Sequence, residues 1–326
     1  MQSILFVFLL SILAVFSNRY EHPEGTDDDT ASGLDPTTDL DDRDVCIHKF
    51  YAAAMTSNIL WAGSDQSHKF VATYYTDRLT TKEWPLYDRP GNDYFQNKGD
   101  LWEFSTDTTD CIHPSDVISL SYRAASKDGW NIETAFTIVS LDDGRYALLT
   151  ADVDAYRWID TDKTDQREFT LNRFAAEPHC RWARNECVDK LYVFALTSGN
   201  FTSGSDSHNV FGLRVTSDKR KEVKLYDRTG DDFLENKADL WVLDAKQFAR
   251  RRRCLKFGAI RDVALTARSA NSFLVSDKWQ VQSAFVIGQL KSGRFALLSA
   301  DANVHQFVDE SQTHGVNELR LPLQNC

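Results

Sequence analysis

Apolar and aromatic residues recur along the chain in runs of five to eight residues, with turn residues between them. No segment keeps a helical period over a long stretch, and the runs favour β-branched and aromatic side chains, which is typical of β-strands. In the first half, we expect strands near 48–56, 69–76, 83–88, 100–105, 116–123, 133–141, 144–151 and 167–173. In the second half, we expect them near 189–197, 209–216, 222–227, 239–244, 261–268, 281–290, 293–300 and 317–323.

The second half of the chain repeats the first. The longest match pairs Gly144–Asp152 with Gly293–Asp301, and a second pairs Asn97–Trp102 with Asn236–Trp241. The offset between the halves ranges from 139 to 149 residues, so small insertions fall in loops. Eight short antiparallel strands in each copy predict an all-β protein of two tandem eight-stranded antiparallel β-sandwiches.

The repeated motifs resemble the PLAT/LH2 domain family, which occurs beside lipoxygenases and lipases and in polycystins. That family has a Thr-Gly-x-x-x-x-Ala-Gly-Thr-Asp stretch after its first strand, and Thr56–Asp65 and Thr197–Asp206 fit it without gaps. Serine replaces a family glycine at 57 and 198, and a family threonine at 64 and 205. An aromatic, an Asp and a second aromatic follow at the family spacing in both copies, as Tyr94, Asp100 and Trp102, and as Phe233, Asp239 and Trp241. A Trp then opens the sixth strand (Trp130, Trp279), and a late aromatic follows (Trp158, Phe307).

Alternating strand directions send successive loops to opposite poles of a sandwich. We call the pole at the start of the first strand the base and the opposite pole the tip. The tip loops of the first copy then hold Trp61, Asp65, the segment 90–97, the segment 127–130 and the segment 152–158. The cysteines and the interdomain linker fall at the base. We expect Trp102, Trp130, Trp241 and Trp279 to lie in the cores, and Asp100 and Asp239 to anchor loops.

The N-terminal residues predict secretion. Ile4–Phe16 is an uncharged apolar run too short to span a bilayer, so residues 1–17 are expected to be a signal peptide. The segment Glu21–Asp44 carries ten acids and one Arg, a charge of −9, which leaves about −2 of the total −11 for the rest. The expected organisation is a signal peptide (1–17), an acidic disordered leader (18–44), sandwich 1 (45–174), a linker (175–186) and sandwich 2 (187–326). We expect no transmembrane segment, and the nearly neutral body argues against nucleic acid as a partner.

Six cysteines behind a signal peptide predict disulfides in an oxidising compartment. They are Cys46, Cys111, Cys180, Cys187, Cys254 and Cys326. Three per copy means that at least one bridge crosses between copies unless two thiols stay free. Cys111–Cys254 and Cys180–Cys326 are both open as the crossing bridge.

The tip acids are candidate calcium ligands. Asp65 and Asp93 lie on separate tip loops of the first copy, and Asp206 and Asp232 on those of the second. Calcium takes six to eight oxygen ligands, which converging loops can supply. The resemblance implies calcium at this pole, since some PLAT domains bind it there. Alternatively, these side chains cap turns, as Asp routinely does.

Ile59, Leu60 and Trp61 are candidates for contact with a membrane or a partner, because a Trp on a protruding loop suits a half-wet interface. Alternatively, Trp61 packs against its own domain. The equivalent loop of the second copy holds Phe201 within Asn200-Phe-Thr, an N-glycosylation acceptor. A glycan on Asn200 would hinder insertion of that tip into lipid.

A basic run, Arg250, Arg251, Arg252 and Arg253, lies in a base loop beside Cys254. A convertase cleavage site, a patch for anionic glycan or lipid, and a solvated loop are all open interpretations.

No GxSxG, HExxH, P-loop or GxGxxG motif is present, so the sequence predicts a non-catalytic protein. Our first hypothesis is a secreted protein that binds lipid surfaces or extracellular proteins through its tip loops, with calcium as a candidate cofactor. The alternative is a structural component of the extracellular matrix or of secretion that binds no lipid. A hydrolase or lipoxygenase fragment is disfavoured, because both copies are accounted for as sandwiches.

Overall fold

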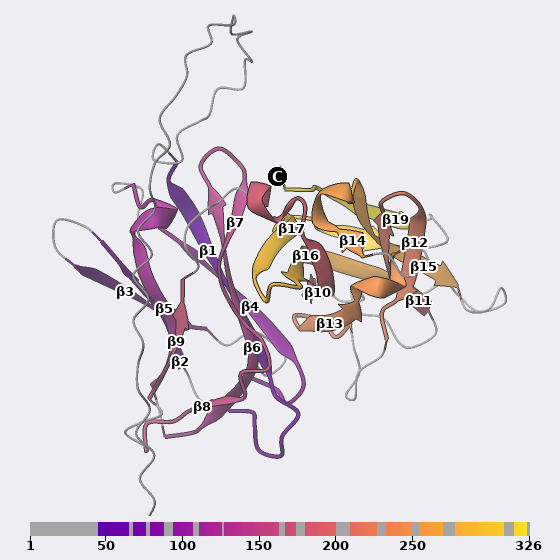
Figure 1. Ribbon diagram of the computed structural model, residues 1–326. Coiled ribbons are helices and arrows are strands. Elements are labelled where there is room, and N and C mark those ends of the chain that lie inside the picture. The colour runs from indigo at the N-terminus through magenta and orange to yellow at the C-terminus, as the bar shows by residue number, and fades with distance from the viewer. Residues whose placement is uncertain are drawn as a thin grey trace, which may run out of the picture. The chain divides into compact units, whose positions relative to one another are not determined.

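Two antiparallel sheets face each other in the first copy (Figure 1). A computed structural model describes residues 45–64, 68–75, 79–87, 94–106, 111–125, 127–162, 167–173, 180–199, 209–226, 233–249, 254–269, 278–309 and 316–324, all within the unit Asp41–Cys326. One sheet has the order β3-β2-β5-β9, with β3 (Thr80–Leu86), β2 (His68–Tyr74), β5 (Val117–Ala124) and β9 (Glu168–Asn172). The other has the order β4-β1-β6-β7, with β4 (Gly99–Ser105), β1 (Ile47–Thr56), β6 (Trp130–Leu141) and β7 (Tyr146–Asp152).

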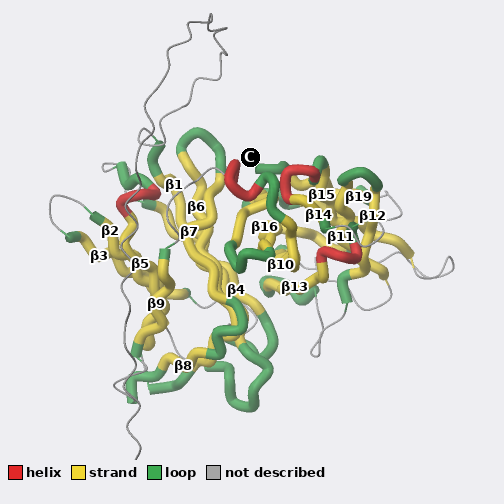
Figure 2. Tube along the Cα trace, viewed as in Figure 1, coloured by secondary structure: helices red, strands yellow, loops and turns green. Residues whose placement is uncertain are grey.

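The second copy repeats this arrangement strand for strand. Its outer sheet has the order β12-β11-β15-β19, with β12 (Arg220–Lys224), β11 (Asn209–Thr216), β15 (Asp262–Ser269) and β19 (Glu318–Leu321). Its inner sheet has the order β17-β16-β10-β13, with β17 (Phe295–Asp301), β16 (Trp279–Leu290), β10 (Cys187–Thr197) and β13 (Ala238–Asp244). Among the described residues, helical structure is confined to 3-10 turns: η2 (Pro114–Asp116), η3 (Cys180–Ala183), η4 (Ala245–Gln247) and η5 (Phe257–Ala259) (Figure 2).

All sixteen expected strands are present, and the all-β prediction is confirmed. Three short strands were not predicted, because two or three residues are too few to show alternation: β8 (Arg157–Ile159), β14 (Leu255–Lys256) and β18 (Gln306–Val308). The turn between β6 and β7 closes through the Gly144 amide, which donates to the Leu141 carbonyl at 3.0 Å. Gly144 and its counterpart Gly293 both have φ of 84°, a conformation that glycine adopts without strain.

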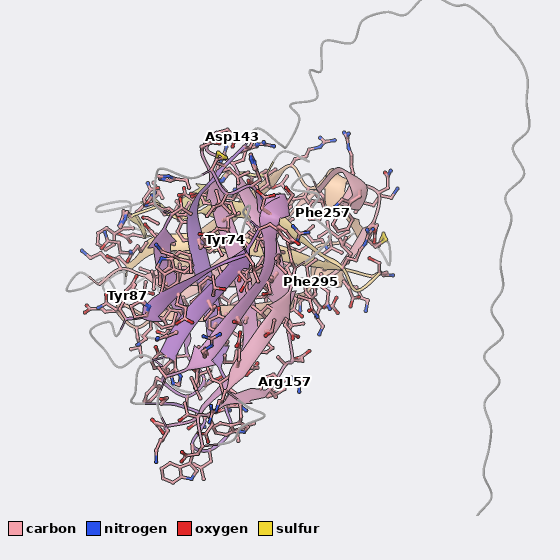
Figure 3. The ribbon with its side chains drawn as sticks, turned by 90° about the vertical axis from the view of Figure 1, so that its left-hand side faces the viewer. Tyr74, Tyr87, Asp143, Arg157, Phe257 and Phe295 are labelled. Atoms are coloured by element: carbon pink, nitrogen blue, oxygen red, sulfur yellow. A yellow bond between two sulfur atoms is a disulfide. The ribbon has the colours of Figure 1, made fainter. Side chains whose placement is uncertain are left out.

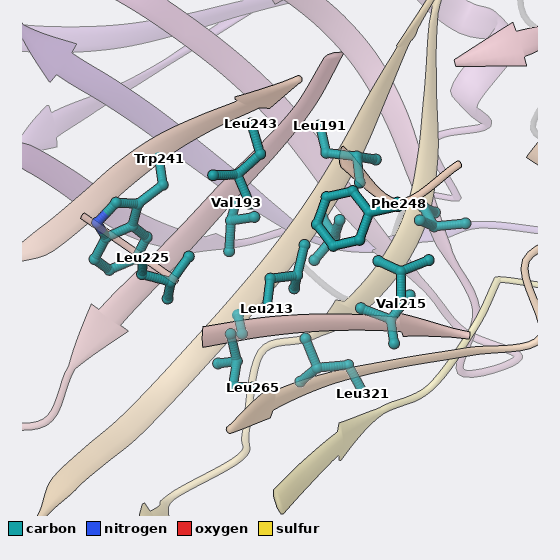
Figure 4. Packing of buried hydrophobic residues seen from close by; sticks show 14 of the residues in the cluster. Leu191, Val193, Leu213, Val215, Leu225, Trp241, Leu243, Phe248, Leu265 and Leu321 are labelled. Atoms are coloured by element: carbon teal, nitrogen blue, oxygen red, sulfur yellow. The ribbon is translucent and has the colours of Figure 1, made fainter. Parts of the chain in front are cut away.

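Each sandwich encloses its own apolar core. In the second copy, Leu191 and Val193 of β10 meet Leu213 and Val215 of β11 across the space between the sheets (Figure 4). The four tryptophans expected in the cores, Trp102, Trp130, Trp241 and Trp279, are all completely buried.

A third core lies between the two copies, which the sequence analysis did not anticipate. Alternate residues of β1 point to opposite faces: Phe50 and Ala52 belong to the core of the first copy, whereas Tyr51 and Ala53 belong to this shared core. The shared core collects such residues from both inner sheets. Because the central part of β1 is buried on both faces, its sequence there is continuously apolar, FYAAAM. The equivalent part of β10 is LYVFAL, for the same reason.

The shared core has an approximate two-fold symmetry. The rings of Tyr51 and Phe285 lie 5.8 Å apart between centroids, and those of Phe136 and Tyr192 are also 5.8 Å apart. Each pair joins one copy to the other, and the partners hold equivalent positions in the repeat. An antiparallel bridge between Gly99 and Ala238 joins β4 to β13, so the two inner sheets are continuous.

Two buried ion pairs cross this junction. The Lys98 ammonium contacts Asp239 at 3.2 Å, and Lys237 contacts Asp100 at the same distance. The four side chains are at most 3% exposed. The carboxylates also accept backbone bonds, from the Tyr94 amide to Asp100 at 2.9 Å and from the equivalent amide to Asp239 at 2.8 Å. Asp100 and Asp239 therefore anchor loops as predicted, and they also tie the copies together.

Candidate functional site

The loop that follows β1 forms an exposed apolar turn at the tip of the first copy. The Ala62 amide donates to the Ile59 carbonyl at 3.0 Å, which makes Leu60 and Trp61 the two central residues of the turn. Trp61 has φ of 67°, which is uncommon for a bulky residue. The exposed fractions are 44% for Ile59, 70% for Leu60 and 80% for Trp61. Trp61 therefore does not pack into its own domain, and this removes the alternative interpretation.

Backbone hydrogen bonds hold this turn on the sandwich. The Asn131 amide at the start of β6 donates to the Ala62 carbonyl at 2.9 Å, and the Ser57 amide donates to the Asn131 carbonyl at 3.0 Å. Gln96 on the next tip loop donates through Nε2 to the Asn58 carbonyl at 3.0 Å. The turn thus presents its side chains from a backbone fixed at both ends.

Phe95 adds a fourth exposed apolar side chain beside the turn, with 48% of its surface accessible. We call Ile59, Leu60, Trp61 and Phe95 the apolar tip. Phe95 was not predicted from the sequence, although it lies between Tyr94, a residue of the repeated motif, and Gln96, which donates a hydrogen bond to Asn58. The signal available was its place within the expected tip segment 90–97.

A buried polar chain lies behind this turn. The Ser64 hydroxyl donates to an Asp128 carboxylate oxygen at 3.0 Å, and the His68 Nε2 lies 3.0 Å from the same hydroxyl. Since the serine proton is directed to Asp128, His68 donates through Nε2. Burial lowers the pKa of His68 to about 4, against an opposing effect of the Asp128 charge. His68 packs against the rings of Tyr94 and Trp130, with centroids 4.9 and 5.4 Å away.

This chain differs from a catalytic triad in its order. In a triad the carboxylate orients the imidazole and the imidazole takes the serine proton. Here the carboxylate contacts Ser64, and His68 is buried with a pKa that leaves it neutral and weakly basic. The arrangement fixes the tip loop to the segment before β6.

The tip and the base lie at opposite ends of the first copy. Asp143, in the β6–β7 turn, lies at the base, and Arg157 of β8 lies at the tip (Figure 3). At the base, Cys46 is bonded to Cys111, and in the second copy Cys187 is bonded to Cys254.

Both bridges lie within a copy, so a Cys111–Cys254 crossing bridge is excluded. Cys326 and the side chain of Cys180 lie outside the described residues. A third bridge would have to join these two, which leaves Cys180–Cys326 as a prediction.

Several predicted site residues also lie outside the described residues. They are the calcium candidates Asp65, Asp93, Asp206 and Asp232, the tip residues Asn200 and Phe201, and the basic run Arg250–Arg253. Within the described part of the chain, no group of three or more His, Cys, Asp or Glu side chains could hold a metal ion. None of the helical turns described here is long and apolar enough to cross a membrane.

Comparison with known proteins gives a likeness of fold only. No protein-family model matches the chain, and the search of curated proteins found no match. Two solved structures align with part of it, the alpha toxin of Clostridium absonum and the Clostridium perfringens alpha-toxin from an avian strain. Each alignment has 16% identity and a TM-score of 0.32, and covers 43% of this chain and 32% of the toxin chain. The matched part thus spans about a third of each toxin, and the PLAT/LH2 assignment stays a resemblance.

Proposed function

We propose that the protein is a secreted, non-catalytic binding protein that docks on lipid surfaces through the apolar tip of its first copy. The observation that carries this proposal is the turn itself: adjacent aliphatic and indole side chains are exposed on a backbone held by hydrogen bonds. Exposed apolar side chains gathered at one place on a soluble domain mark contact sites. An indole suits the boundary between headgroups and acyl chains, because it is apolar with one polar edge.

The surroundings of the tip support a lipid surface as the partner. Lys127 and Arg157 are exposed on the neighbouring tip segments, where they can contact anionic headgroups, Lys127 in exchange for its exposed ion pair with Asp162 at 4.0 Å. The two disulfides are of the kind that persists outside the cytosol, in keeping with secretion. Calcium held by Asp65 and Asp93 belongs to the proposal as a cofactor that would bridge the tip to anionic headgroups.

Vesicle sedimentation tests this proposal. The mature protein is mixed with phosphatidylcholine vesicles, or with vesicles that also contain phosphatidylserine, in calcium or in chelator. We expect binding that falls about tenfold in Trp61→Ala, because a large apolar side chain contributes about 1.5–3 kcal/mol when it leaves water. Loss of binding in chelator would support calcium, whereas equal binding in calcium and chelator would remove it.

The matched control is Tyr75→Ala. Tyr75 is a large side chain, 67% exposed, that follows β2 at the base of the same copy. We expect this variant to bind vesicles as the unaltered protein does. Absence of binding under every condition would overturn lipid as the partner and favour a protein partner or a matrix role.

A further inference from the structure

A cavity of about 420 Å³ opens at the base of the second copy, away from the apolar tip of the first. One side is the turn between β11 and β12, with Asp218 and Lys219. The other side comes from the segment between β13 and β15, with Phe248, Leu255 and Lys256. The volume falls within the range of small-molecule sites.

The cavity belongs to the second copy because of a longer loop. The segment between the fourth and fifth strands covers residues 106–116 in the first copy and 245–261 in the second, eleven residues against seventeen. The longer segment folds as η4, β14 and η5, and all three supply walls of the cavity or flank it. The length difference within the duplicated domain therefore supplies a wall of the cavity in the second copy.

The walls are held in place before any ligand arrives. β14 pairs with the start of β10, where Leu255 lies opposite Val188, and the Cys187–Cys254 disulfide closes the same corner. The Lys221 ammonium donates to the Ala249 carbonyl at 2.9 Å, which ties β12 to the end of η4. Such a preformed site loses little entropy on binding.

The lining combines buried apolar residues with exposed lysines. Phe248 and Leu255 are 2% and 3% exposed and line the cavity. Lys219 and Lys256 are exposed at the rim, and neither has a carboxylate partner among the described residues. Asp218 is the one acidic residue of the lining. Four arginines, at 250–253, connect two residues of the wall, Ala249 and Cys254, and no part of the site is built on them.

We propose that this cavity binds a single-chain organic anion, with its apolar chain against Phe248 and Leu255 and its anionic head between Lys219 and Lys256. Charge complementarity selects the anion, because two ammonium groups with no carboxylate partner in the described part of the chain lie beside a low-dielectric surface. The apolar side chains of the lining favour a ligand with a hydrocarbon chain over an inorganic ion, because only the chain can pack against them.

Titration calorimetry with octyl sulfate, below its critical micelle concentration, tests the site in the mature full-length protein. We expect one saturable site, with octanol and inorganic sulfate each bound at least about tenfold more weakly. The double variant Lys219→Gln, Lys256→Gln should lower the affinity for octyl sulfate about fivefold or more. Lys224→Gln is the matched control, since Lys224 is an exposed lysine of β12 outside the lining, and it should change nothing.

The result that would overturn the proposal is octyl sulfate binding that the double variant leaves unchanged, or octanol binding of equal strength. Absence of saturable binding would also overturn it. Because the apolar tip lies in the other copy, Trp61→Ala should leave this titration unaffected. Absence of octyl sulfate binding would therefore not bear on vesicle docking, and absence of vesicle binding would not bear on this cavity.

Discussion

The two copies share their interiors, and the structure describes a different functional loop in each. Both have the same sheets, the same buried tryptophans and the same disulfide at the base. The first copy carries an exposed apolar turn at its tip, and the second carries a longer base loop that walls a cavity. Because loops tolerate change far better than packed strands, a duplicated domain can acquire two surfaces of different chemistry on one scaffold.

The interface between the copies likewise combines contacts that are the same on both sides with contacts that differ. The Lys–Asp pairs are symmetric, with equal distances of 3.2 Å. The apolar residues beside these pairs are not symmetric. Phe194 packs against Gly99, whereas the position equivalent to Phe194 holds Ala53 and the position equivalent to Gly99 holds Ala238. A phenylalanine thus lies against a glycine on one side of the junction, and alanines hold both equivalent positions on the other side.

The largest expected effect comes from removing one partner of a buried pair. Lys98→Met leaves the Asp239 carboxylate without its cation in a buried site, which should lower the free energy of unfolding by about 3–5 kcal/mol. If the junction is symmetric in energy as in geometry, Lys237→Met should cost the same within about 1 kcal/mol. Urea unfolding of both variants measures the two losses.

A double-mutant cycle measures the interaction free energy between Lys98 and Asp239 separately from the effect of each single change. Asp239→Asn keeps an oxygen for the Phe233 amide but removes the charge, so Lys98→Met with Asp239→Asn should cost less than the two single changes together. Additive losses, or a Lys98→Met loss below about 1 kcal/mol, would show that the pair does not hold the copies together.

A pH-dependent loss should distinguish the first copy from the second. His68 lies two residues before Phe70, and Asn209 lies two residues before the equivalent Phe211. The folded pKa of His68 is about 4, below the unfolded value of about 6.5, so the unfolded state binds more protons between these limits. The stability that His68 confers is therefore complete above pH 6.5, is lost as the pH falls toward 4, and should be reduced by about 2 kcal/mol at pH 5.

His68→Asn introduces the residue of the second copy and removes this titration. Urea unfolding at pH 7 and pH 5 should show a pH-dependent loss that is about 2 kcal/mol smaller in the variant than in the unaltered protein. Comparing the two proteins cancels the carboxylates that titrate in both. An equal loss in the two proteins would place the pKa of His68 near its ordinary value.

The strands and cores could be predicted from the sequence because alternation and buried aromatics are local signals. The apolar run in β1 also indicates burial on both faces, but it does not show which surface covers the second face. The burial of Lys98 could not be predicted, since nothing in its neighbourhood shows that Asp239, 141 residues later, lies beside it. The cavity could not be predicted either, because its walls join the turn between β11 and β12 to the segment between β13 and β15, which only the fold brings together.

A smaller effect should reveal the asymmetry of the junction. A Cβ on Gly99 would lie 3.0 Å from the Ala238 carbonyl oxygen and 3.1 Å from a ring carbon of Phe194. Gly99→Ala should therefore destabilise by about 1–3 kcal/mol through overpacking. Phe194→Leu in the same chain should recover part of this loss relative to the sum of the single changes, as measured by thermal unfolding. Full additivity would show that the Phe194 ring is not what restricts this position.

The smallest expected effect should be equal in the two copies. Gly144 and Gly293 both have φ of 84°, and a Cβ at either position would meet nothing within 4 Å. Replacement by Ala should thus cost only the strain of a left-handed conformation, about 1 kcal/mol in each copy. Urea unfolding of Gly144→Ala and Gly293→Ala should give matching losses, and adding both changes should double them, because the two turns share no contacts. Unequal losses would mean that one turn is held by contacts beyond its own backbone, and the division into shared scaffold and divergent loops would then fail at these turns.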